Sequence, residues 1–403
     1  MSNQNQCDTL SYSETVTTMP FPFWKLFAFT MAGFLTIMTE TIPAGLLSQL
    51  SHDLQISEVL AGQLITIYAL GSVIAAIPVV AMTRKLNRRP LFLSAIGALF
   101  IFNSATAVSA DYTLTLIARF IAGMAAGVIW GLFAGYARRL VPSYLQGKAL
   151  ALASVGQPIA LCIGVPLGTF LGALFDWRGV FWIMSGIALI LLFWIRFVVP
   201  DFSGQSEKQK LSVYRVFCLP GVRAVLFTLL AWILAHNILY TFIAPYLSNI
   251  AATISLEIIL LIFGVSCLIG IWIIGLLVDR GLRMLTLVSL LLFAISAIFF
   301  MFAQYSFGFL LVGVITWGIS FGGAPTLLQT ALADSADEHA DVAQSMLVTI
   351  FNLAVAGGGI VGGLLLDSLG AGSFPVVLLV LSLAAFIMVY FANKAGFRAG
   401  ARE

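Results

Sequence analysis

Long runs of apolar residues alternate along this chain with short segments that hold most of its charged and turn-forming residues. Each run is long enough to cross the hydrocarbon core of a bilayer, which takes about 20 apolar residues in a helix. Counting the runs between polar breaks predicts an all-α membrane protein of twelve transmembrane helices. In chain order the predicted helices are Trp24–Leu47, Val59–Met82, Leu91–Ala110, Tyr112–Tyr136, Ala149–Leu174, Gly179–Val199, Ala224–Leu247, Ile258–Val278, Leu285–Gln304, Phe307–Ala333, Val342–Leu366 and Phe374–Ala392.

Composition excludes a water-soluble fold. Of the 403 residues 61% are hydrophobic and 9% charged, whereas a soluble domain has about 25% charged residues. The net charge of +3 is too small to indicate binding to nucleic acid. The sequence contains no catalytic triad, phosphate-binding loop, haem pair or zinc-ligand spacing, so we expect no enzyme activity, cofactor or metal. The four cysteines lie far apart, and we interpret them as small apolar or incidental residues.

Lysine and arginine predict the orientation in the membrane. With both termini in the cytoplasm, all but two of the 20 basic residues fall in inner loops, tails or inner helix ends, and the exceptions are Arg119 and Arg178. The first twenty residues are polar and lack the basic segment and short apolar core of a signal peptide, so we expect a disordered cytoplasmic tail there. The protein is therefore predicted to be a multi-pass protein of the bacterial inner membrane.

The longest inner loop divides the chain into two six-helix halves. We expect a tail over 1–20, bundles over 21–199 and 222–394, a cytoplasmic linker over 200–221 and a second tail over 395–403. An ungapped offset of 195 residues superimposes glycines and basic residues of the two halves, for example Gly123 on Gly318 and Lys85 on Arg280. The chain is thus predicted to be a parallel repeat of two bundles.

Glu40 and Arg119 are the candidates for proton coupling. Each is the one residue of its charge well inside its predicted helix, and each lies seven residues from the outer end. At 1.5 Å per residue both sit about 10 Å below the outer surface, so they can meet. An ionised carboxylate is costly in the hydrocarbon region, which makes Glu40 a candidate to bind and release a proton. The alternatives are a structural ion pair, Arg119 bonded to carbonyl groups, or Glu40 facing the outer vestibule.

Further polar residues inside the predicted helices are candidates to line a substrate cavity. His236 and Asn237 lie near the middle of the seventh helix, where the histidine is a proton relay, a substrate donor or a partner of a neighbouring carbonyl. Gln157 and Asn352 are equivalent positions of the repeat, and we favour a wet cavity over helix-to-helix contacts for them. Three aromatic residues are weaker candidates, because lone aromatics usually belong to the core: Tyr68, Tyr240 and Trp317.

Glycines spaced four apart form one face of the predicted fifth helix, including Gly164 and Gly168. Such a face lets two helices pack backbone to backbone in lipid. It serves either static close packing or a contact that slides while the halves rock. Pro158 and Pro166 of the same helix are expected bending points.

Several runs of residues carry a resemblance to a known family. They are Thr39 to Leu47, Gly62 to Leu70, Trp317 to Gln329, and Phe351 to Ala354. On these runs the chain resembles the major facilitator superfamily over nearly its whole length. Within that superfamily it looks like the twelve-helix drug:proton antiporters, in the branch that holds arabinose-type and sugar-efflux permeases, purine exporters and chloramphenicol resistance proteins.

The family's loop motif between the second and third helices is degraded here. Arg88 and Arg89 match it, and Arg84 stands where an aspartate is expected, so the sequence does not support the usual inner gating salt bridge of the first half. The second half has a better copy, which includes Asp279 and Arg280.

Two more family motifs bear on mechanism. The fourth-helix motif is present as Arg119, Gly123 and Gly127, and the resemblance implies a role of its arginine in proton coupling. The fifth-helix antiporter motif reads Gly164-Val165-Pro166-Leu167-Gly168, with Val165 in place of the usual glycine, and implies export.

These patterns predict a monomeric transporter in which two halves rock about a central cavity, so that inward proton flow drives the export of a small organic compound. Sugars, nucleosides and drugs all remain candidate substrates. The alternatives are an importer or uniporter of the same fold and, further off, a membrane receptor or enzyme that transports nothing.

Overall fold

The computed structural model describes residues 21–76, 82–83, 85–142, 145–203, 213–252, 254–336, 339–397 and 400. All regular structure within these ranges is helical. The predicted tail over 1–20, residue Arg84 and most of the predicted linker lie outside the described residues.

The first half of the chain forms the helices α1 (Phe23–Gly45), α2 (Leu47–Asp53), α3 (Glu58–Ala76), α5 (Arg88–Val108), α6 (Tyr112–Arg139), α7 (Gln146–Ser154), α8 (Gly156–Ile159), the π-helical turn η2 (Ala160–Gly164) and α9 (Val165–Val198). The second half forms α10 (Val213–Phe217), α11 (Val222–Thr241), α12 (Ile243–Asn249), α13 (Leu256–Phe302), α14 (Phe307–Gly322), α15 (Ala324–Ala336), α16 (Ala340–Leu369), the 3₁₀ turn η4 (Ala371–Ser373) and α17 (Phe374–Phe391).

The number of membrane crossings follows from the lengths of these helices. Ten helical segments of the described chain are long and apolar enough to cross a membrane. Two of them, Lys148–Val198 and Leu256–Phe302, have 51 and 47 residues. At 1.5 Å per residue each extends about 70 Å or more, over twice the roughly 30 Å hydrocarbon core. Each also contains a residue with non-helical backbone angles, Asp176 and Gly281 respectively. Each of the two segments therefore crosses the membrane twice. The predicted fold of twelve transmembrane helices is confirmed.

The break at Asp176 is fixed by polar contacts at one end of the first bundle. Asp176 has φ 65° and ψ 159°, and its carboxylate accepts a hydrogen bond from the Trp177 N–H at 2.6 Å. Asp53, at the end of α2, accepts hydrogen bonds from the Trp177 indole at 3.0 Å and from Arg178. The hydrogen bond from Arg178 is the main reason why the pKa of Asp53 is lowered. This cluster holds the ends of the first and sixth passes together.

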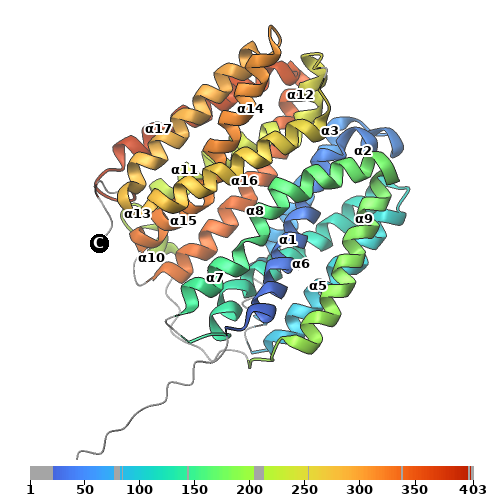
Figure 1. The fold of residues 1–403 in the computed structure, drawn as a ribbon, viewed down its shortest axis with the longest axis vertical. Coiled ribbons are helices and arrows are strands. Elements are labelled where there is room, and N and C mark those ends of the chain that lie inside the picture. The colour runs from blue at the N-terminus through green and yellow to red at the C-terminus, as the bar shows by residue number, and fades with distance from the viewer. Residues whose placement is uncertain are drawn as a thin grey trace, which may run out of the picture.

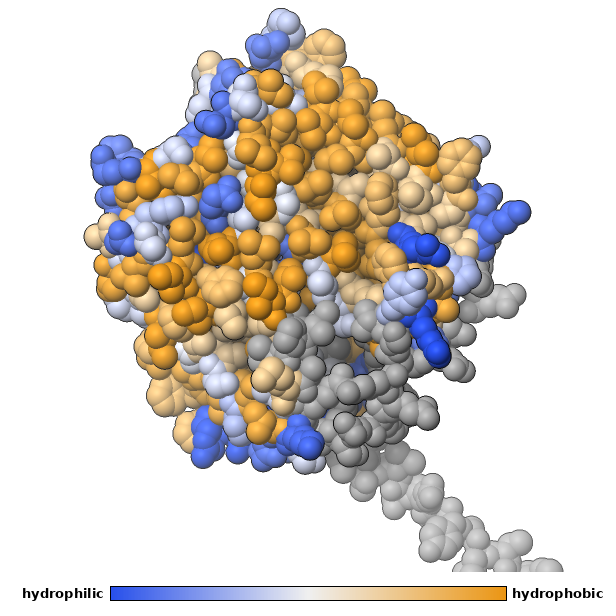
Figure 2. Space-filling view, turned by 180° about the vertical axis from the view of Figure 1, so that it is seen from behind, coloured by the Kyte–Doolittle hydropathy of each residue, from blue (hydrophilic) through white to orange (hydrophobic). Residues whose placement is uncertain are grey.

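The helices gather into two bundles, as Figure 1 shows with α1 to α9 in blue to green and α11 to α17 in yellow to red. Within the bundles the most extensive pairings are α3 with α6 and α13 with α14. The bundles meet where α3 packs on α16 and where η2 and α9 pack on α13. Hydrophobic side chains cover most of the face in Figure 2, with hydrophilic ones toward its edges, as expected for a surface that faces lipid.

The middle of the fifth pass is not a regular α-helix. Residues Ala160–Gly164 form a π-helical turn between α8 and α9. Pro166 follows two residues later; it has no N–H to donate, and its ring excludes the carbonyl four residues earlier, that of Cys162. The turn therefore lies between the two predicted bending points, Pro158 and Pro166.

Candidate functional site: a cavity between the two bundles

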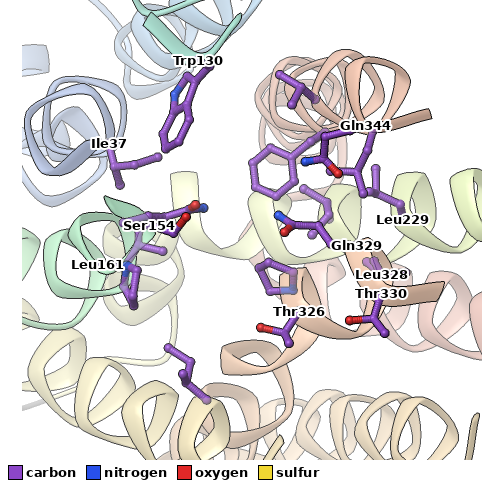
Figure 3. A pocket seen from close by; sticks show the side chains of 18 of the residues that line it. Ile37, Trp130, Ser154, Leu161, Leu229, Thr326, Leu328, Gln329, Thr330 and Gln344 are labelled. Carbon is purple, nitrogen blue, oxygen red and sulfur yellow. The ribbon is translucent and has the colours of Figure 1, made fainter. Parts of the chain in front are cut away.

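A cavity of about 760 Å³ lies between the bundles and is lined by residues of both. Figure 3 looks into it, with Ile37 and Trp130 on one wall and Gln329 and Gln344 on the facing wall. Its lining includes Arg138 in the last turn of α6 and Gln344 in the first turns of α16. These helix ends lie on the side of the molecule where α1 begins and α17 ends, called here the terminus-bearing side. The cavity thus reaches the terminus-bearing side.

The bundles close against each other on the opposite side. Gln63 on α3 donates a hydrogen bond through Nε2 to the Gly359 carbonyl on α16, at 3.2 Å. A Cβ added at Gly359 would overlap the Thr66 hydroxyl, and one added at Gly62 would overlap the Phe242 ring at about 2.5 Å. Glycine is needed at these positions because backbone and side chains approach so closely. The structure is therefore open on one side and sealed on the other.

Glu40 lies on α1 at the closed end of the cavity. Its side chain is buried and contributes to the cavity wall. The Glu40 carboxylate forms no hydrogen bond or ion pair with any residue that the structure describes. A carboxylate in this setting is left to form hydrogen bonds with the contents of the cavity.

Arg119 lies directly behind Glu40 and is completely buried. Its Nη2 donates to the main-chain carbonyl of Glu40 at 3.4 Å, and its Nε donates to the Leu64 carbonyl at 3.3 Å. Its guanidinium also lies over the ring of Tyr68, 4.7 Å from the centroid. The structure brings the predicted pair together, but the contact is to the backbone of Glu40, which is the carbonyl-bonded alternative.

His236 faces Glu40 from the other bundle, on α11. Its Nδ1 accepts a hydrogen bond from the Trp317 indole N–H at 3.1 Å. Its ring stacks on Phe321, with centroids 3.5 Å apart and planes 7° apart. An indole nitrogen can only donate, so Nδ1 is the unprotonated nitrogen and Nε2 carries the hydrogen. The imidazole is thereby held as a neutral donor.

A second, small cavity of about 40 Å³ joins these groups at the closed end. It is large enough for a water molecule. Five predicted site residues line it, two from the first half and three from the second: Glu40, Gln157, His236, Asn237 and Tyr240.

Of the remaining candidate residues, one lines the cavity and two hold other site residues in place. Asn352 lines the main cavity while its Nδ2 donates to the Val348 carbonyl at 2.9 Å, so its side-chain oxygen is left to accept. Tyr68 and Trp317 line neither cavity: the Tyr68 hydroxyl donates to the Thr36 carbonyl at 3.0 Å, and Trp317 lies behind His236. In this conformation they support Arg119 and His236.

Sequence reasoning overlooked other polar residues of the cavity. Thr326, Gln329 and Gln344 line it together with Trp130. The signal for Gln329 was available, since it ends one of the runs that carry the family resemblance. Gln344 lies at a helix start among charged residues, where an amide is unremarkable in sequence.

The glycine face of the fifth pass contacts α1 within the same bundle. A Cβ at Gly164 would overlap Met38, and one at Gly168 would overlap Ile42. Their repeat equivalents do lie between the bundles, where Gly359 meets Thr66 and Gly363 meets Val59 and Gln63. The face of Gly164, Pro166 and Gly168 thus packs against α1, the helix that carries Glu40. This contact within one bundle corresponds to the static close packing of the two alternatives.

The loop motif finds its acidic partner elsewhere in the chain. Asp201, just after the sixth pass, accepts hydrogen bonds from the Arg89 N–H at 3.0 Å and from Asn87 at 2.9 Å. The Arg88 N–H donates to the Phe202 carbonyl at 2.8 Å. In the second half, Asp279 and Arg280 lie at the break of α13. The start of α5 is therefore bound by an aspartate that is distant in sequence. The family motif instead predicts an aspartate close to this helix start in the sequence.

Two bundles of six crossings around a cavity that is open on one side, with an apolar wall that carries several side-chain amides, define a membrane transporter. The sequence profile of the Major Facilitator Superfamily matches residues 29–341 and 251–402, and the chain belongs to this family. The predicted family and the transport class are thereby confirmed.

Individual relatives agree with this assignment. The chain is 30% identical to the purine ribonucleoside efflux pump NepI of Escherichia coli (strain K12) over 345 residues, which are 85% of this chain and 87% of that protein. The pump of the same name from Shigella sonnei (strain Ss046) is 30% identical over 340 residues, 84% of this chain and 86% of that protein. The human organic anion transporter MFSD10 (TETRAN) has the same fold, with a TM-score of 0.70 and 16% identity over 92% of this chain and all of that one.

Proposed function

We propose that this transporter exports a small, uncharged, polar compound of the nucleoside kind in exchange for protons, with Glu40 as the proton carrier. The observation that carries the proposal is the Glu40 carboxylate, which lines the cavity without a hydrogen bond or ion pair to any described residue. A group that titrates in contact with the substrate space can change the affinity for substrate, and only such a difference in affinity shifts the equilibrium between conformations.

Arg119 has a positioning role in this scheme. Its hydrogen bonds to the carbonyls of Glu40 and Leu64 tie α6 to α1 and α3. His236, held neutral by Trp317, is then a fixed donor for the substrate or for a water shared with Glu40. The carrier is accordingly Glu40 and not His236.

The wall chemistry supports a neutral, hydrogen-bonding substrate with a flat ring. Side-chain amides from both bundles line the cavity, namely those of Gln157, Gln329, Gln344 and Asn352. Amides offer donors and acceptors together, which suits ring nitrogens and hydroxyl groups. Trp130, Phe321 and Phe351 supply faces for stacking. Relatives named as purine ribonucleoside efflux pumps cover most of the chain, which is consistent with such a substrate.

The direction of transport rests on orientation. With both termini cytoplasmic in a bacterial inner membrane, the cavity faces the cytoplasm in this conformation and can load a substrate for export. The proposed domain boundaries, with a tail before residue 21 and a linker between the bundles, belong to the same topology. A single chain encloses the whole cavity, which supports a monomer as the working unit. Reporter fusions at the C-terminus test the topology: activity only from a periplasmic reporter contradicts it.

Coupled export is tested in everted membrane vesicles as uptake of labelled inosine and adenosine. An imposed pH gradient, acidic inside the vesicles, supplies the driving force. We expect the wild type to accumulate label, and an uncoupler to abolish accumulation. Glu40→Gln imitates the protonated carboxyl group and should exchange label without concentrating it. Glu257→Gln, at the start of α13 and far from the cavity, is the matched control and should behave as wild type.

The outcomes separate the alternatives. Accumulation by Glu40→Gln equal to the wild type would remove this carboxylate from coupling. If the label only reaches equal concentrations on both sides, with or without the pH gradient, the protein is a uniporter of the same fold. Gradient-driven loss of label from the vesicles would indicate import.

A further inference from the structure

Two buried cysteines face each other across the boundary between the bundles. Cys162 lies in the π-helical turn η2 of the first bundle, and Cys267 lies on α13 of the second. Both are free thiols, nearly inaccessible from the outer surface, and both contribute to the cavity wall. The two side chains are close enough to influence each other.

The two segments that carry these residues are in close contact. A Cβ added at Gly264 on α13 would overlap the main chain of Cys162, lying about 2.6 Å from its Cα. Cys267 is one helical turn beyond Gly264 and on the same face, where neighbouring positions are about 5–6 Å apart. Cysteines whose Cα atoms lie about 4.4–6.8 Å apart can form a disulfide without backbone movement. This close contact between η2 and α13 is the geometric basis for a bond between the two cysteines.

We propose that Cys162 and Cys267 form a reversible disulfide under oxidation by a small peroxide, and that this bond locks the two bundles with the cavity open on the terminus-bearing side. The pair is a modification site outside the transport chemistry, and the proposal holds whatever the substrate and coupling ion are. It follows from the position of the pair, because the bundles touch here and must part for the cavity to open on the other side.

The chemistry balances with hydrogen peroxide as the oxidant. One thiol loses its proton, and the thiolate attacks a peroxide oxygen so that the O–O bond breaks. The hydroxide that leaves takes up this proton, so a sulfenic acid and one water result. The second thiol attacks the sulfenic sulfur, the S–S bond forms, the S–O bond breaks, and a second water leaves. The two sulfurs together lose two electrons, which reduce one peroxide. The oxidant enters through the open cavity. Two small thiols entering by the same route reverse the bond, because the first opens it to a mixed disulfide and the second releases the remaining cysteine, leaving a small disulfide.

The cross-link is tested on the full chain with Cys7 and Cys218 replaced by serine, so that only the pair remains. A protease site placed between Ser203 and Val213 allows the chain to be cut between the bundles after peroxide treatment. On a non-reducing gel we expect one band of full length, which separates into two halves when dithiothreitol is added. Cys162→Ser and Cys267→Ser in the same background should separate without reductant. Separation of the oxidised pair-only protein without reductant would refute the disulfide.

The lock is tested by hydrogen exchange of the same proteins in lipid nanodiscs, which needs no substrate. Opening on the sealed side exposes backbone around Gly62 on α3 and Gly359 on α16. We expect peroxide to slow exchange in both segments, dithiothreitol to restore it, and Cys162→Ser to show no peroxide effect. Unchanged exchange in a protein whose cross-link has formed would overturn the lock and leave only the modification site.

Discussion

The Arg119 guanidinium donates a hydrogen bond to the main-chain carbonyl of Glu40 at 3.4 Å, and no ion pair joins it to the carboxylate of that residue within the described part of the chain. A fixed charge tied to the backbone stays in place whether or not the carboxylate is protonated. The arrangement therefore separates two tasks: Arg119 holds the three helices at constant geometry, while the Glu40 side chain is free to respond to the cavity.

Replacing Arg119 by lysine tests this division of tasks. An ammonium group keeps the charge but cannot span the two carbonyls as the planar guanidinium does. A hydrogen bond to a charged group contributes about 1.5–3 kcal/mol, so we expect Arg119→Lys to lower the free energy of unfolding by that order. Gradient-driven transport should be reduced but not abolished. Thermal unfolding in detergent and the vesicle assay measure the two effects. Stability and transport both equal to the wild type would show that the two carbonyl contacts are dispensable.

Much of the fold was predictable because lipid imposes a simple rule. A backbone in hydrocarbon must satisfy its own hydrogen bonds, so each apolar run of sufficient length becomes a helix, and the basic residues then orient it. The breaks at Asp176 and Gly281 fall between predicted helices for this reason. The depth argument for Glu40 and Arg119 also held to the extent that the residues meet.

Other features depend on contacts that no linear pattern specifies. Counting turns gives the depth of Arg119 but not which oxygen of Glu40 it reaches. Glycines at a spacing of four indicate a packing face, yet Gly164 contacts α1 of its own bundle whereas its repeat equivalent Gly359 contacts the other bundle. Asp201 replaces a missing acidic residue from more than a hundred positions away. Such partners are chosen by the three-dimensional arrangement.

Asp201 is expected to stabilise the start of α5. Its carboxylate accepts from the Arg89 N–H, which belongs to the first turn and has no partner within the helix. Removal of such a cap costs about 0.5–2 kcal/mol, so Asp201→Ala should lower the midpoint of thermal unfolding. Asp201→Asn retains an acceptor and is the matched control, with a smaller loss. An alanine variant as stable as the wild type would show that the contact contributes nothing to folding.

Bulky substitution of the fifth-pass glycines should disturb the helix that carries Glu40. Leucine at Gly164 or Gly168 would collide with Met38 or Ile42 on α1. We expect both variants to be inserted in the membrane in normal amounts and to lose transport. Gly186→Leu is the control, because a Cβ at that position meets no atom within 4 Å. The vesicle assay, normalised to protein in the membrane, decides the matter. Normal transport by both variants would show that α1 tolerates displacement.

Gly359→Leu is expected to act on the conformational equilibrium, because this glycine lies where α16 closes on α3. A Cβ there would overlap the Thr66 hydroxyl, and a leucine side chain needs still more room between the bundles. The substitution also threatens the hydrogen bond from Gln63 to the Gly359 carbonyl. Both effects disfavour the conformation that is sealed on this side and leave the opposite conformation less affected. We therefore expect transport to be lost while hydrogen exchange around Gly62 becomes faster than in the wild type. Gly164→Leu provides the contrast, since it should lose transport without faster exchange at Gly62. Wild-type exchange at Gly62 in the Gly359→Leu protein would mean that this contact does not hold the bundles closed.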